Sequence, residues 1–216
     1  PEGEGSTGEM AGFFYRGARI QPKMWGYCPR SGLEDKIDTN QTGLNFACLA
    51  QVPESQAGLM SRRAFAAAFK SGNFDFVAFT SHTRFRWAAE PLDREAQARE
   101  ICANYSDSST CSISKDTVGR YYEIKAIADQ FQIVEKFDQD VIFMGDFNLE
   151  STKQNKPVWD ATLKAAPGYF VYQNEKTSLS IPQQKLNSSY DHFILNEKRL
   201  AECDLKSIRP YDFTRA

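Results

Sequence analysis

Histidine is the scarcest chemically active residue of this chain, which contains only two, His82 and His192. None of its five cysteines forms a Cys-x-x-Cys pair, so the sequence does not indicate a zinc site. No stretch approaches the ~18 consecutive apolar residues that a membrane-spanning helix needs, and we expect no membrane partner. The net charge of −2 over 216 residues argues against a generally basic coat for nucleic acid and leaves only a local basic patch.

The cysteines leave the compartment undecided. Cys102 and Cys111 flank the polar stretch ANYSDSST and are predicted to form a disulfide if the protein is exported. An odd number of cysteines leaves at least one free thiol in either case.

The pattern of apolar and polar residues along the chain predicts one α/β domain over residues 1–216. Apolar runs predict strands at 74–82, 139–148 and 190–195, and the three-and-four spacing of apolar residues predicts a helix over 118–137. Further predicted elements are strands at 10–16 and 18–25, a surface helix over 91–105, and a segment at 61–72 that reads as helix or strand. Strands that alternate with helices favour a layered α/β fold.

Polar residues follow the most apolar of these runs, in DVIFMGDFNLE at 140–150. Asp146 and Asn148 lie two positions apart, which places both side chains on one side of an extended chain. The Asp is a hard oxygen ligand for Mg²⁺ or a hydrogen-bond acceptor for a water, and the Asn amide donates to a phosphate oxygen. The alternative is an Asx turn that closes the strand, where both residue types are common.

The two histidines also lie at or near the ends of apolar runs. His82 ends the strand predicted at 74–82, and His192 follows Asp191 in SSYDHFIL. A carboxylate beside a histidine orients the ring and stabilises its protonated form. For a single histidine at a strand end, the alternative is a purely structural hydrogen bond.

Taken together in their order along the chain, these motifs resemble the endonuclease/exonuclease/phosphatase superfamily, and the deoxyribonuclease I branch in particular. The similarity lies in GDFN after an apolar strand, TSHTRF at the end of another, SSYDHF further on, and Glu9 placed six residues before Tyr15-Arg16. It extends from about residue 9 to about residue 213. The resemblance implies a four-layer α/β/β/α sandwich of the deoxyribonuclease I-like type, which lacks terminal strands in this chain.

The resemblance also implies roles for individual residues. Glu9 is expected to hydrogen-bond His82, which makes His82 one of the family's general acid/base pair. Asp146 and Asn148 are expected to be catalytic residues that hold the metal ion, with Asn148 also on the phosphate. Asp191 is expected to support a second histidine and the metal, which is Mg²⁺ or alternatively Ca²⁺ or Mn²⁺.

Arginines at three positions are candidate contacts to the phosphates of DNA: Arg16, Arg84 and Arg86. For each one, a solvated surface position is the alternative. His192 is a weaker candidate for the family's terminal catalytic histidine, because Asp191 matches the family's Tyr-Asp position rather than its closing triplet.

Two family elements are missing from the sequence. The family opens with strands that carry an Asn and a metal-binding Glu, and it closes with a Ser-Asp-His triplet. We expect flanking sequence, or a second chain, to supply these strands, because a sheet without them exposes unpaired backbone groups.

The function predicted from the sequence is divalent-metal-dependent hydrolysis of DNA phosphodiester bonds. The alternatives are a phosphatase or phosphodiesterase of the same superfamily and a catalytically silent binding scaffold. The resemblance favours a secreted or periplasmic location.

Overall fold

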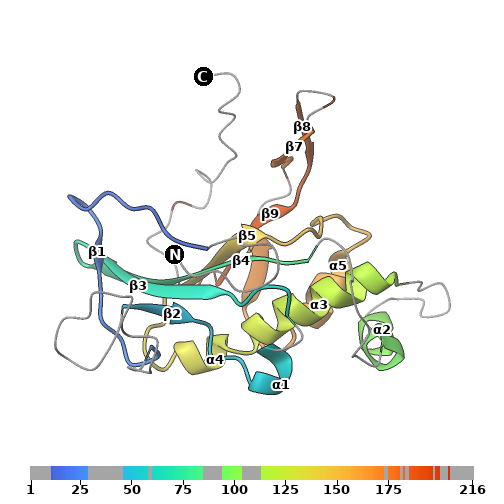
Figure 1. The fold of residues 1–216 in the computed structure, drawn as a ribbon, viewed down its shortest axis with the longest axis horizontal. Coiled ribbons are helices and arrows are strands. Elements are labelled where there is room, and N and C mark those ends of the chain that lie inside the picture. The colour runs from blue at the N-terminus through green and yellow to red at the C-terminus, as the bar shows by residue number, and fades with distance from the viewer. Residues whose placement is uncertain are drawn as a thin grey trace.

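The chain forms a mixed α/β structure in which a large twisted sheet lies against a layer of helices (Figure 1). The computed structural model describes residues 11–28, 46–57, 60–84, 94–103, 113–172, 175–180, 182, 185–196, 198–199 and 204. The strands are β1 Gln21–Pro22, β2 Ala47–Leu49, β3 Phe65–Ser71, β4 Phe74–His82, β5 Val141–Asp146, β6 Tyr169–Tyr172, β7 Ser178–Ser180, β8 Lys185–Ser188 and β9 Asp191–Asn196. The helices are α1 Glu54–Ala57, α2 Arg94–Cys102, α3 Lys115–Ala128, α4 Phe131–Val134 and α5 Lys156–Thr162.

The main sheet has the strand order β1-β3-β4-β5-β9-β6, and β2 also pairs with β3. β3 and β4 form an antiparallel hairpin, β4 and β5 run parallel, and β9 pairs antiparallel with both β5 and β6. The parallel pair needs a crossover connection, and the chain between β4 and β5 contains α2, α3 and α4. β4 and β5 therefore end at the same edge of the sheet.

Helices cover one face of this sheet, and the main core lies between the two layers (Figure 1). Phe79 of β4, Phe143 of β5 and Ile194 of β9 point to this face and are fully buried. Phe131 of α4 packs edge-on against Phe143 with ring centroids 5.9 Å apart. The helix predicted over 118–137 is divided into α3 and α4, because the amides of Asp129 and Gln130 bond to carbonyls at the end of α3 in a tightened turn. Both pieces keep their apolar side toward the sheet.

The opposite face of the sheet carries a second apolar cluster near β3. Phe65 and Phe69 of β3 are buried there, and Phe13 packs on both rings at centroid distances of 5.8 and 5.5 Å. Of the strand predicted at 10–16, Ala11 forms an isolated bridge, and the prediction is wrong for residues 12–16, which pair with no strand. The rings of Phe13 and Tyr15 instead lie on the sheet face, whereas Phe14 is exposed. Within the second predicted strand, only Gln21–Pro22 pairs, as β1.

The α/β class predicted from the sequence is confirmed. The described part of the chain contains one large sheet with one helical layer, which is half of the expected four-layer arrangement. Cys28 and Cys48 form a disulfide that the sequence did not indicate. Cys102 is also disulfide-bonded, whereas its predicted partner Cys111 lies outside the described residues. No helix in the described ranges has both the length and the apolar character needed to cross a membrane.

Candidate active site

Three of the predicted site residues lie in one row across adjacent strands. The register pairs His82 of β4 with Asp146 of β5, and Asp146 with Asp191 of β9. Paired residues on neighbouring strands point to the same face of a sheet. The three side chains therefore project together from the face opposite the main core, at the edge where β4 and β5 end and β9 begins.

The side chains of this row are close enough to affect one another electrostatically. His82 Nε2 lies 3.9 Å from Asp146 Oδ2, and the two side chains are 41% and 32% exposed. Burial raises the pKa of Asp146 above its usual value, and the negative charge of Asp191 raises this pKa further. The amide of Asn148 and the positive charge of His82 act in the opposite direction. The site thus holds two carboxylates that repel each other beside an imidazole.

Asn148 closes the turn that follows β5. Its backbone has a φ of 49°, a left-handed conformation that Asn adopts more readily than most residues. Its amide N–H donates to Asp146 Oδ1 at 2.9 Å, and its side-chain Nδ2 donates to the carbonyl of Thr83 at 2.8 Å. The structure therefore contains the Asx turn that the sequence analysis gave as the alternative for Asp146 and Asn148. The predicted contact of Asn148 with metal or phosphate stays a prediction.

Gly145 lets the two site-bearing strands approach each other closely. It pairs with Ser81, and a Cβ built on Gly145 would lie 1.9 Å from the Ser81 carbonyl oxygen. Its φ of 157° is also uncommon for residues with a side chain. A glycine is therefore required directly before Asp146.

We expect Gly145→Ala to lower the free energy of unfolding by about 2–3 kcal/mol, because the added methyl forces β4 and β5 apart. Urea unfolding of the full chain measures this. Gly72→Ala is the matched control: its φ is 63°, but no atom lies within 4 Å of the added Cβ. Only the left-handed backbone is then strained, at about 1–2 kcal/mol. Equal unfolding free energies for wild type and Gly145→Ala would contradict the close approach.

His192 belongs to the core and not to the row, which corrects its place among the site candidates. It follows Asp191 in a strand, so its side chain points to the helical face, where it is 2% exposed. Its ring stacks on Phe147 at a centroid distance of 6.1 Å, and Nε2 hydrogen-bonds the carbonyl of Leu149 at 2.8 Å. The alternation of side chains along β9 decides this.

Arg84 also points inward, contrary to the prediction that it contacts phosphate. Its guanidinium forms an ion pair with the buried carboxylate of Glu123 at 2.7 Å, and its side chain is 10% exposed. Arg16 is exposed on the segment before β1, and its contact with DNA stays a prediction. Glu9 and Arg86 lie outside the described residues, so their predicted roles have no structural counterpart here.

Two other arginines lie at this edge of the sheet, and the sequence analysis did not select them. Arg62 Nη1 donates to the carbonyl of His82 at 3.3 Å, and Arg120 Nε donates to the carbonyl of Arg84 at 3.4 Å. Burial lowers the pKa of Arg120, and the charge of Asp146 is among those that oppose this shift. Arg120 lies between the buried residues Val118 and Tyr121 of α3, so helical periodicity gave a weak signal for its position, whereas no sequence pattern indicated Arg62.

The start of β9 is held by the β7–β8 hairpin, which extends from the sheet edge away from the helices (Figure 1). Thr177 Oγ1 accepts hydrogen bonds from the amides of Tyr190 at 3.2 Å and Asp191 at 3.0 Å. The side chain of Asp191 is exposed. The hairpin therefore borders the row and fixes the backbone from which Asp191 projects.

The carboxylates of the row suit a divalent cation that keeps part of its water shell. Within the described ranges, no three side chains of the His, Cys, Asp and Glu types lie close enough to hold a metal ion by themselves. Mg²⁺ is commonly bound by one or two carboxylates together with waters and substrate phosphates. Asp146 and Asp191 provide two such carboxylates, and a cation between them would relieve the repulsion that raises the pKa of Asp146.

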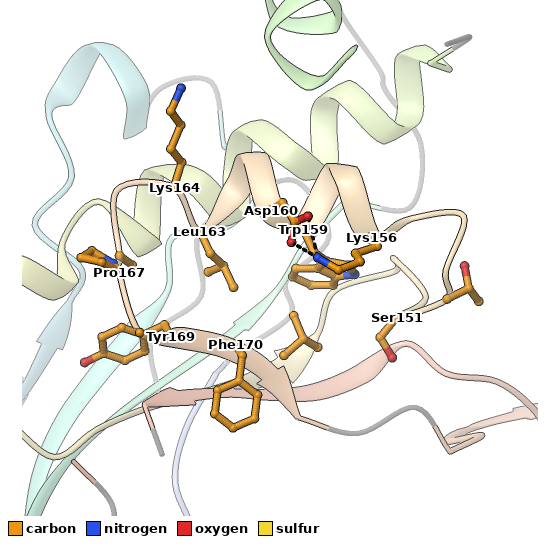
Figure 2. A pocket seen from close by; sticks show the side chains of 13 residues that line it. Ser151, Lys156, Trp159, Asp160, Leu163, Lys164, Pro167, Tyr169 and Phe170 are labelled. Carbon is orange, nitrogen blue, oxygen red and sulfur yellow. Dashed lines mark hydrogen bonds and ion pairs between the residues drawn. The ribbon is translucent and has the colours of Figure 1, made fainter. Parts of the chain in front are cut away.

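A cavity of about 480 Å³ lies elsewhere, between α5 and β6 (Figure 2). Trp159 and Leu163 of α5 and Tyr169 and Phe170 of β6 line it, and Lys156 on its rim is paired with Asp160 at 2.7 Å. None of the row residues lines this cavity. The ring of Trp159 also contacts the buried His192 at a centroid distance of 5.5 Å.

No family model matches the chain, and no curated protein matches it. Among solved structures, the human nocturnin catalytic domain with bound sulfate is similar at 12% identity and a TM-score of 0.37, over 83% of this chain and 62% of that one. A conserved protein of unknown function from Enterococcus faecalis V583 is similar at 15% identity and a TM-score of 0.35, over 84% of this chain and 57% of that one. Sphingomyelinase C from Streptomyces griseocarneus is similar at 12% identity and a TM-score of 0.33, over 62% of this chain and 42% of that one. The chain thus spans less than two thirds of the length of each.

Proposed function

We propose that this chain hydrolyses DNA phosphodiester bonds with the help of a divalent cation. The observation that carries the proposal is the row of His82, Asp146 and Asp191, which three adjacent strands place on one face of the sheet. The sequence motifs GDFN, TSHTRF and SSYDHF support it, because they supply this row in the order seen in the deoxyribonuclease I branch.

Hydrolysis of a phosphodiester adds water across a P–O bond, so one proton leaves the attacking water and one reaches the departing oxygen. His82 is the group of the row that we assign as the general acid or base. Asp146 Oδ2 lies 3.9 Å from its Nε2, where a carboxylate can orient the ring. The half-exposed ring lies at the sheet edge, where a phosphate group in solution can reach it.

Asp146 and Asp191 would hold the cation, Mg²⁺ or alternatively Ca²⁺ or Mn²⁺. When bound, such an ion neutralises charge on a phosphate and lowers the pKa of a coordinated water. The guanidinium groups of Arg62 and Arg120 add positive charge at the same edge, beside the backbone of residues 82–84. A local basic edge of this kind is compatible with the net charge of −2.

The proposal is tested on the full chain with supercoiled plasmid, with and without Mg²⁺, beside a small aryl phosphodiester and an aryl phosphomonoester. We expect metal-dependent nicking of the plasmid, and a fall of about 10²–10⁴-fold on His82→Ala. His192→Gln serves as a control in which the other imidazole is lost.

The other outcomes separate the alternatives. Turnover of the small esters without plasmid nicking would assign a phosphatase or phosphodiesterase of other substrates. Absence of both turnover and metal-dependent heat in calorimetry would assign a silent binding scaffold and overturn the proposal.

We further infer that the protein works in an oxidising compartment outside the cytosol. The disulfide between Cys28 and Cys48 and the disulfide-bonded Cys102 support this, because structural disulfides persist mainly in exported proteins.

A further inference from the structure

The helix α3 places a carboxylate in the protein interior, directly behind the candidate active site. Glu123 is 1% exposed, and its two oxygens accept three hydrogen bonds and form an ion pair with Arg84. Arg84 Nε and Nη2 each lie 2.7 Å from Oε1, and the backbone amide of Arg84 donates to Oε2 at 2.9 Å. The amide of Ser61 donates to Oε1 as well. Glu123 therefore binds two backbone segments in addition to the guanidinium of Arg84.

The first of these segments directly follows His82. Thr83, between His82 and Arg84, is bonded to the loop after β5 through each of its polar groups. Its N–H donates to the Asp146 carbonyl at 2.9 Å, and its Oγ1 donates to the Phe147 carbonyl at 2.6 Å. Its own carbonyl accepts the Asn148 side-chain amide at 2.8 Å. These hydrogen bonds link the end of β4, which carries His82, to the end of β5, which carries Asp146, and to the residues that follow it.

The second segment leads to Arg62. Because Ser61 is held by Glu123, the next residue, Arg62, starts from a fixed backbone position, and its Nη1 donates to the carbonyl of His82 at 3.3 Å. Both segments that Glu123 binds therefore end at the backbone of His82.

We propose that Glu123 is a positioning residue of the active site, which sets the placement of His82 relative to Asp146 by holding the backbone amides of Arg84 and Ser61. This inference rests on the proposed function of the row. An ion pair with Arg84 alone would not require contacts with two amides from different segments. Displacement of a reacting group by as little as 1 Å costs about 10²-fold in rate. Hydrogen bonds that fix the backbone two residues after His82 therefore affect the rate through the position of the imidazole.

Glu123→Gln tests the hydrogen bonds to the amides of Arg84 and Ser61 with little change in side-chain shape. It removes the negative charge and one of the two acceptor oxygens, so one backbone amide loses its partner. We expect kcat on the phosphodiester substrate to fall about 10- to 100-fold while KM stays within about threefold, because alignment and not substrate binding is lost. Asp129→Asn, which weakens the surface pair with Lys125 on the same helix, is the matched control and should leave both constants unchanged.

A second variant separates positioning from stability. Arg84→Met combined with Glu123→Gln removes the cation that Glu123→Gln leaves buried without a carboxylate, so the unfolding temperature should recover relative to the single variant. If Glu123 positions His82 through the amides, kcat stays low in this pair. Recovery of kcat in parallel with stability would show that Glu123 only stabilises the fold, and would overturn the inference.

A readout independent of activity uses the two histidines of the chain. In NMR spectra of the full chain, Glu123→Gln should shift the imidazole signals of His82, whereas those of His192, buried on the other face, should stay in place. Unchanged His82 signals would overturn the inference. If the wild-type protein hydrolyses no phosphodiester with any cation, the proposed function fails, and the spectra still decide whether Glu123 sets the position of His82.

Discussion

Asp146→Asn is expected to reduce metal-dependent plasmid nicking about 10³-fold. The asparagine keeps an oxygen that can accept the amide of Asn148, as Oδ1 of Asp146 does at 2.9 Å. It therefore removes the charge beside His82 and Asp191 without removing the bond that closes the turn. Asp160→Asn, at an exposed pair with Lys156 on α5, is the control and should retain full activity.

The same substitution should not destabilise the protein at neutral pH. Burial and the charge of Asp191 raise the pKa of Asp146 above its usual value of 3.8, so the ionised carboxylate is disfavoured in the folded state. A raised folded pKa contributes stability that is present below the unfolded pKa and is lost as the pH rises through the folded pKa. Asp146→Asn should thus be at least as stable as wild type at pH 7, with the difference shrinking below pH 3.8.

Urea unfolding at the two pH values checks this prediction. A variant that is inactive and clearly less stable at pH 7 would show that Asp146 is needed for the fold, and that its loss of activity says nothing about catalysis. Burial of Asp146, and its repulsion by Asp191, disfavour the ionised carboxylate in the folded state, as expected if the row serves function at the expense of stability.

Glu123→Ala is expected to produce the largest loss of stability, about 3–5 kcal/mol. Its removal leaves the guanidinium of Arg84, 10% exposed, without the carboxylate that it contacts at 2.7 Å. It also leaves the amides of Ser61 and Arg84 without their acceptor. Thermal and urea unfolding of the full chain measure the change.

The matched control is Asp129→Ala, which breaks the pair with Lys125 on the surface of the same helix and should cost at most about 0.5 kcal/mol. Replacing both members of the buried pair by methionine should be less costly than Glu123→Ala alone, because no buried charge is then left over. A loss below about 1 kcal/mol for Glu123→Ala would mean that water reaches Arg84.

The strands that carry the site were predictable because their signals are local. The apolar run at 74–82 matches β4 residue for residue, β5 lies within its predicted range, and β9 is shifted by one residue from the strand predicted at 190–195. The polar residues at the ends of these runs were recognised for the same reason: an uninterrupted apolar strand buried on both faces makes a carboxylate or histidine at its end conspicuous. The turn residues Gly145 and Asn148 follow the same logic, since few other residues fit their backbone conformations.

The predictions that were wrong depend on contacts between residues far apart in the sequence. Arg84 has the sequence context of a surface cation, and only the packing of α3 against β4 brings Glu123 to it. Glu123 itself occurs four residues before the buried Ile127, so periodicity hinted at burial but gave no partner. Phe13 and Tyr15 match a strand pattern, yet their rings pack on Phe69 of β3 and their backbone does not pair with it.

The sequence by itself determined the α/β class, the strands that form the sheet centre and the identity of the residues at their ends, because each of these depends on neighbours within a few positions. Only the tertiary structure decided which of those residues meet. The register of β4, β5 and β9 brings His82, Asp146 and Asp191 to one face and turns His192 to the other. Strand register and helix docking join residues 40 to 100 positions apart, and their outcome depends on burying the whole apolar surface at once.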